Sequence, residues 1–133
     1  MARRTPVAQR LRSRPRLLTS VAALAIDCAD PPRLAEWWRR LLGGKIEIDT
    51  DGDATLHAPQ GWRLDFLAVP DPKTVKNRLH LDLRGSDFSM AIEQAIALGA
   101  TRAADVYQGD RWQVLRDPEG NEFCILRPAR AEG

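Results

Sequence analysis

The feature that most constrains this chain is an internal repeat, because one order of predicted elements occurs twice. An apolar run over 18–28 predicts a strand, and a helical pattern follows the turn at Asp30-Pro31-Pro32. Asp30 is a suitable N-cap for this helix, and Gly43-Gly44 predicts its end. Three short strands are then predicted, at 45–49, 54–58 and 62–69. The first half therefore has the order β-α-β-β-β.

The second half repeats this order. Residues 78–84 alternate leucine with polar side chains, which is typical of a strand. Asp87 then precedes a predicted helix that ends at Gly99, and strands are predicted at 101–106, 111–116 and 121–127. A module of about 50 residues is too small to bury both faces of its sheet alone. We therefore predict an α+β fold, with one domain over 18–130 built from modules at 18–70 and 76–128.

The repeat also predicts which positions are equivalent in the two modules. Aligning the two helix caps places Ala23 opposite His80. Aligning the glycines that open the two last strands places Asp65 opposite Cys124. If a pseudo-twofold axis relates the modules, these four residues should converge in one cup.

Three sequence motifs resemble a known superfamily. The run Asp117-Pro118-Glu119-Gly120-Asn121-Glu122-Phe123 is similar to the DP(D/E)GN-x-(F/I) signature of the vicinal oxygen chelate (VOC) superfamily. That group includes glyoxalase I, extradiol dioxygenases, and the bleomycin and fosfomycin resistance proteins. Residues 29–44 and 76–83 resemble the module openings of its glyoxalase-like domains, so the resemblance covers about residues 20–128. It implies paired βαβββ modules that curl into a half-open, mixed β-sheet barrel with the helices outside and a small organic ligand in the cup.

Metal-dependent members of this superfamily carry ligands on the inward faces of the first and last strands, where the four repeat-derived positions fall. Ala23 cannot bind a metal, whereas His80 can. Asp65 is shorter than the usual Glu, and Cys124 would bind only as a thiolate, which favours zinc. We therefore expect either an incomplete site for Zn, Ni, Mn or Fe on His80 and Asp65, or no metal. This departure from the family pattern puts the glyoxalase I reaction in doubt.

Two functions remain open at this stage. In the first, a His80–Asp65 pair catalyses a lyase, isomerase or dioxygenase type reaction, either as acid and base or as part of a metal site. In the second, the domain binds or sequesters a small molecule without a metal, as bleomycin-binding relatives do. Under either hypothesis the ligand-binding candidates are Asp82, Trp112, Cys124 and Arg63. The alternatives are that His80 only lines a polar cup, and that Cys124 and Trp112 are core residues.

Charge is distributed unevenly along the chain. Residues 1–26 contain six arginines and no acid, whereas the remainder is mildly acidic, so we predict a basic, disordered leader over 1–17. Nucleic acid is not an expected partner, because the arginines over 1–16 have no interleaved aromatics. The sequence contains no run of 18 apolar residues, so it predicts no membrane span. The two cysteines lie far apart in the sequence, which suggests reduced thiols in the cytoplasm. We expect a homodimer, in which the modules pair either within one chain or between chains.

Overall fold

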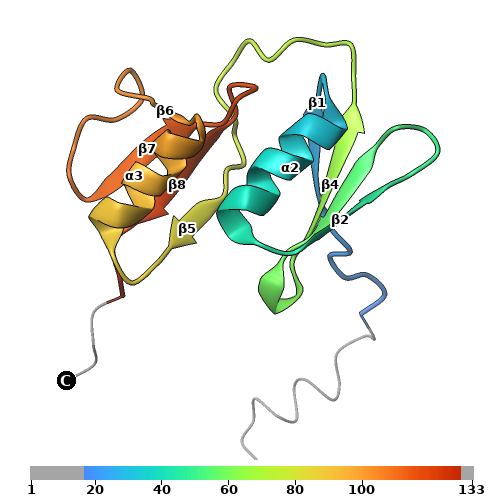
Figure 1. The fold of residues 1–133 in the computed structure, drawn as a ribbon, viewed down its shortest axis with the longest axis horizontal. Helices are drawn as coiled ribbons and strands as arrows, with labels where there is room; N and C mark the ends of the chain where they lie inside the picture. The colour runs from blue at the N-terminus through green and yellow to red at the C-terminus, as the bar shows by residue number, and fades with distance from the viewer. Residues whose placement is uncertain (1–16, 130–133) are drawn as a thin grey trace, which may run out of the picture.

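The computed structural model describes residues 17–129 and contains the predicted repeat (Figure 1). The first module comprises β1 (Leu24–Cys28), α2 (Pro31–Leu42), β2 (Lys45–Ile48), β3 (Ala54–His57), a short 3-10 turn η1 (Pro59–Gly61) and β4 (Arg63–Ala68). The second module comprises β5 (Asp82–Arg84), α3 (Phe88–Leu98), β6 (Thr101–Arg102), β7 (Trp112–Arg116) and β8 (Glu122–Leu126). Apart from Leu17, the predicted leader lies outside the described residues.

Each module forms one open, mixed sheet of four strands. The strand orders are β1-β4-β3-β2 and β5-β8-β7-β6, so the two sheets have the same topology. In each sheet the first strand runs parallel to the last, and the other neighbours are antiparallel. The prediction of an α+β fold with two βαβββ modules and no closed barrel is therefore confirmed.

Both helices begin and end at the predicted residues. The Asp30 side chain accepts a hydrogen bond from the Arg33 N–H at the start of α2, and Asp87 caps α3 in the same way. Helix α2 ends at Gly43 and α3 at Gly99, both with positive φ, a conformation in which glycine carries no steric penalty. Within residues 17–129, neither helix has the length and apolar character that crossing a membrane requires.

One hydrophobic core joins the two modules. Figure 1 shows both helices on the same side of the molecule, each crossing its own sheet. Trp37 and Trp38 of α2 pack edge-on against Phe123 of β8, with ring centroids 5.8 and 5.0 Å away. Both tryptophans are buried, although adjacent side chains of a helix diverge by about 100°. Packing α2 against both its own sheet and β8 explains why the two rings are covered.

The turn before β8 also connects the modules. Glu119 accepts hydrogen bonds from the backbone N–H groups of Ala29 and Asp30, at 2.6 and 3.0 Å, just before α2. Asp117 accepts one from the Trp38 indole at 3.0 Å and is itself buried. A carboxylate near a helix N-terminus is favourable, so the turn stabilises the joint between the modules.

Three strands are much shorter than the sequence pattern predicts, whereas the others differ from it by one or two residues. Strand β1 begins at Leu24, because the apolar residues before it have no strand partner within the described chain. Leu17, Leu18 and Val21 are each more than 80% exposed. Strand β5 covers only Asp82–Arg84, and β6 only Thr101–Arg102. Apolar composition therefore predicted the strands but not their lengths.

Candidate functional site

The equivalence predicted from the repeat is present in the backbone pairing. In the first sheet Ala25 pairs with Asp65, and in the second Asp82 pairs with Cys124. Ala25 and Asp82 each lie two residues after the predicted equivalents Ala23 and His80. The two modules therefore have the same register at their parallel strand pairs.

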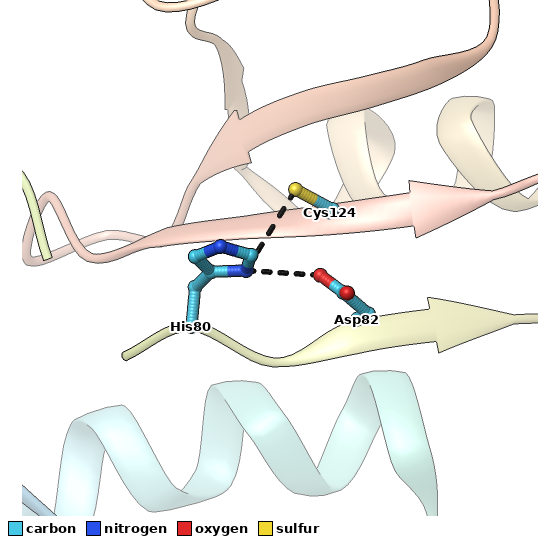
Figure 2. Close-up of side chains that lie close together, drawn as sticks. All are labelled: His80, Asp82 and Cys124. Carbon is cyan, nitrogen blue, oxygen red and sulfur yellow. Dashed lines mark hydrogen bonds and ion pairs between the residues drawn. The ribbon is translucent and has the colours of Figure 1, made fainter. Parts of the chain in front are cut away.

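The second module brings together His80, Asp82 and Cys124 (Figure 2). The His80 Nδ1 lies 2.9 Å from an Asp82 carboxylate oxygen and 4.0 Å from the Cys124 Sγ. His80 precedes β5 and Asp82 begins it, so alternate residues share one face. Cys124 is on the neighbouring strand β8, where it pairs with Asp82. Of the predicted site residues, these three form one cluster.

The cluster lies in a cavity of about 420 Å³. Trp112 of β7 is half-buried and forms part of the cavity wall, which is one of the two positions left open for it by the sequence. Sequence reasoning missed six further lining residues: Lys76, Val106, Tyr107, Val114, Glu122 and Leu126. Tyr107 is carried by the loop between β6 and β7, and no periodicity marks a loop residue as inward-facing.

Asp65 and Arg63 are placed elsewhere, in the first sheet. The Asp65 carboxylate accepts hydrogen bonds from the Thr55 hydroxyl at 2.8 Å and the Arg63 guanidinium at 2.9 Å. Burial opposes ionisation of Asp65, but these bonds lower the pKa of its carboxyl below the ordinary value. The expected His80–Asp65 contact is not formed among residues 17–129. Its place is taken by Asp82, which is two residues from His80 on the same face.

Cys124 is a protonated thiol in this environment. Burial, followed by the negative charge of Asp82 and a hydrogen bond to it, raises the pKa of the Cys124 thiol to about 11. Thiolate is the form that attacks electrophiles and binds metals. The environment of Cys124 therefore favours the neutral thiol over the thiolate.

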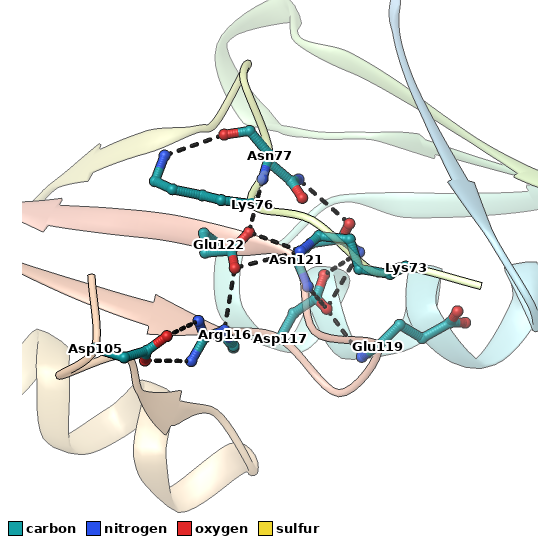
Figure 3. A network of polar contacts seen from close by, with 9 residues as sticks. All are labelled: Lys73, Lys76, Asn77, Asp105, Arg116, Asp117, Glu119, Asn121 and Glu122. Carbon is teal, nitrogen blue, oxygen red and sulfur yellow. Dashed lines mark hydrogen bonds and ion pairs between the residues drawn. The ribbon is translucent and has the colours of Figure 1, made fainter.

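A polar network surrounds Glu122, one of the residues that line the cavity (Figure 3). Glu122 is only 3% exposed and contacts Lys73 at 3.0 Å, Arg116 at 3.1 Å and the Asn77 N–H at 2.9 Å. Burial opposes ionisation, yet these contacts lower the pKa of Glu122 to about 2. Glu122 is therefore ionised and fully engaged with cationic and N–H donors.

The residues present fit a metal ion of the zinc type. The donor atoms of His80, Asp82 and Cys124 all lie within 4.8 Å of one another. One nitrogen, one oxygen and one sulfur are the donors that tetrahedral zinc uses, with a fourth position left for water or a ligand. Manganese prefers oxygen donors, so a sulfur donor disfavours it here.

Comparison with known proteins gives the family and the fold. A family model described as a glyoxalase-like domain matches residues 23–126. A glyoxalase/bleomycin resistance/dioxygenase family enzyme from Burkholderia phytofirmans PsJN is 19% identical with a TM-score of 0.65, covering 81% of this chain and 98% of its own. A variant of the fosfomycin resistance protein FosX from Listeria monocytogenes, complexed with Mn(II) and dihydroxypropylphosphonic acid, is 9% identical with a TM-score of 0.67, covering 85% and 93%.

A hypothetical protein, SA1046 from S. aureus, is 12% identical with a TM-score of 0.64, covering 83% of this chain and 95% of its own. At these identities the structural similarity shows a shared fold and nothing finer about chemistry. No curated protein matches the chain. Because the family match spans both modules, the chain belongs to the glyoxalase-like domain family of the VOC superfamily.

Proposed function

We propose that this protein binds a small organic molecule in the cup of its second module and acts on it as a lyase, isomerase or dioxygenase type enzyme. One observation carries the proposal. The donor atoms of His80, Asp82 and Cys124 converge beside a cavity of about 420 Å³ that has aromatic and aliphatic walls. A few convergent polar groups in a mostly apolar cavity are the usual composition of a ligand site.

His80 is the residue proposed to transfer a proton. When the Nδ1–H donates to Asp82, the tautomer is fixed and Nε2 is left to accept a proton from a ligand. Asp82 thus takes the role that was predicted for Asp65. His80 is partly exposed, so a ligand in the cavity can reach its ring.

As the alternative to this acid–base role, the same three side chains are proposed to hold a divalent ion, with zinc favoured over nickel, manganese and iron, and His80 is then a ligand and not a base. His80 would supply a nitrogen, Asp82 an oxygen and Cys124 a sulfur. Such an ion supplies a Lewis acid that polarises a ligand oxygen. The chain itself contributes the spacing of the donors and the apolar side chains of Trp112 and Val114, which exclude water.

Metal analysis of protein purified without a histidine tag tests this proposal. After soaking with the four ions, we expect one equivalent of metal in the wild type and its loss in His80→Ala and Cys124→Ala. The chain offers matched controls in its other histidine and cysteine, so His57→Ala and Cys28→Ala should retain the metal. Wild-type protein that stays metal-free, or equal loss in the controls, would contradict a metal site here.

A metal-free binding protein is the second candidate function. It is favoured by the neutral Cys124 thiol and by Ala23, which stands where relatives carry a ligand. In this case ligand affinity should be unchanged by a chelator, and no turnover should accompany binding. Affinity that falls on chelation and returns with zinc would exclude it.

We also propose a homodimer. Strands β1 and β5 are edge strands of their sheets, and Leu79 beside β5 is 88% exposed. If these edges pair between two copies, the sheet face that carries Asp65 in one copy would lie beside the second-module cavity of the other copy. Light scattering should give a dimer mass for the wild type and a monomer for Leu79→Asp, whereas Met90→Asp on α3 should remain dimeric. A monomeric wild type at high concentration would contradict the proposal.

A cytoplasmic location is proposed on the state of the two cysteines. Cys28 and Cys124 are both buried and form no disulfide. Proteins of reducing compartments keep such thiols free. Cell fractionation should recover the protein in the cytoplasmic fraction, and its recovery from an exported fraction would contradict this.

A further inference from the structure

We propose that the second-module cup is built for a flat aromatic molecule that carries a negative charge, such as an aromatic carboxylate. The inference rests on the proposed function, because it names the ligand class of the same cavity. The observation behind it is a second set of side chains in this cavity, separate from His80, Asp82 and Cys124. A stacked pair of aromatic rings and one lysine line the cavity that also holds His80.

The stacked pair is Tyr107 and Trp112. Their ring centroids lie 4.2 Å apart, and the ring planes differ by 10°. Both side chains are half-buried, so each retains some accessible surface, and both line the cavity. A rigid flat wall of this kind favours a planar ligand over a saturated one of equal size, because aromatic stacking adds to apolar burial.

The loop that carries Tyr107 is held in place before any ligand binds. Arg116 donates two hydrogen bonds to Asp105, at 2.8 and 2.7 Å, and the buried Ala103 carbonyl accepts from the Tyr107 N–H at 3.2 Å. Gly109 is also required, since a Cβ at this position would overlap the ring and hydroxyl of Tyr107. A wall ordered in advance reduces the entropy cost of binding.

Lys76 supplies the positive charge. The acids of the cavity are already engaged, because Asp82 contacts His80 and Glu122 is neutralised by two cationic side chains outside this cavity (Figure 3). Lys76 forms no ion pair with any residue in 17–129, and its Nζ donates only to the Asn77 carbonyl, at 3.1 Å. Its charge is therefore left for an anionic group at the rim of the aromatic wall.

Calorimetry with three probes of similar size tests the two halves of the inference separately. Naphthoate is flat and anionic, naphthamide is flat and neutral, and decalin carboxylate is anionic but saturated. We expect wild-type protein to bind naphthoate about tenfold more tightly than either of the others, which corresponds to about 1.4 kcal/mol. The dissociation constant of each probe is measured for the wild type and six variants.

Lys76→Met should weaken the binding of naphthoate to the affinity of naphthamide and leave the affinity for naphthamide unchanged. Trp112→Leu and Gly109→Ala should each weaken both aromatic probes several-fold and leave decalin carboxylate unchanged. The matched controls Lys45→Met and Trp62→Leu, which change exposed residues of the first module, should bind all probes like the wild type.

Equal affinity for the three probes, or unchanged discrimination in Lys76→Met, would overturn the inference. Discrimination that is lost in His80→Ala but kept in Lys76→Met would also overturn it, because the anion would then be held at the metal cluster. Absence of binding by all three probes would reject this ligand class. In that case the metal analysis of His80→Ala would still decide the proposed function independently.

Discussion

The inner faces of the two sheets have the same backbone register but different chemistry. In the first module, Asp65 accepts a hydrogen bond from Thr55 and forms an ion pair with Arg63. In the second module, the equivalent strands carry Asp82 and Cys124 beside His80, and these face a cavity with an aromatic wall. The comparison teaches that the repeat determines where side chains are presented, whereas a few differences between the modules determine which of the two faces has the cavity proposed to bind a ligand.

The largest expected effect comes from breaking the contact that holds the two faces in one domain. Trp38→Ala removes a buried ring that packs on Phe123 of the other module and leaves Asp117 without its indole donor. We expect a loss of about 3–5 kcal/mol in the free energy of unfolding, measured in urea. Trp62→Ala changes a tryptophan that is 58% exposed, and its cost should be below about 1 kcal/mol. Equal costs would mean that α2 does not join the modules.

The next largest effect is expected at Glu122, the buried carboxylate of the second module. Glu122→Gln removes the charge that engages Lys73 and Arg116 at a buried position. We expect it to cost about 2–4 kcal/mol, measured by chemical denaturation. Lys73→Gln, which removes only one partner, should cost less. A neutral Glu122→Gln variant would mean that the network in Figure 3 does not stabilise the second module.

The pH dependence of stability should follow the same carboxylate. The pKa of Glu122 is lowered from 4.5 to about 2, so its stabilisation is present above pH 4.5 and is lost as pH falls towards 2. The wild type should lose stability across this window more steeply than Glu122→Gln. Asp117 has the opposite effect on the pH dependence, because burial raises its pKa above 3.8. Its contribution to stability is present below pH 3.8 and is lost as pH rises through the raised pKa. Identical slopes for wild type and Glu122→Gln would contradict this assignment.

The smallest effect is expected in the first module. Asp65→Asn removes a half-buried charge whose partner Arg63 is half-exposed, so solvent replaces much of the interaction. We expect a cost of about 1 kcal/mol or less and no change in metal content of the isolated chain. A change in metal content would show that Asp65 reaches the His80 cluster, as pairing between copies would allow.

The sequence predicts the fold better than it predicts the site. Local signals such as the Asp30 and Asp87 caps and the terminal glycines determine the element order, so the two modules and their register follow from pattern alone. The partner of His80 does not follow in this way. Whether Asp65 or Asp82 lies beside His80 depends on how the sheets are oriented relative to each other. A repeat shows which positions are equivalent but not how far apart their side chains lie. Tyr107 was missed for a related reason, because a loop side chain has no periodicity that marks its direction.

The central claim is that ligand chemistry belongs to the face of the second module. A ¹H–¹⁵N correlation spectrum recorded during titration with zinc and then with naphthoate tests it most directly. We expect the largest shifts on backbone amides near Lys76, His80, Tyr107, Trp112 and Cys124. Shifts confined to β2, β3 and β4 of the first module, with β8 unchanged, would contradict it.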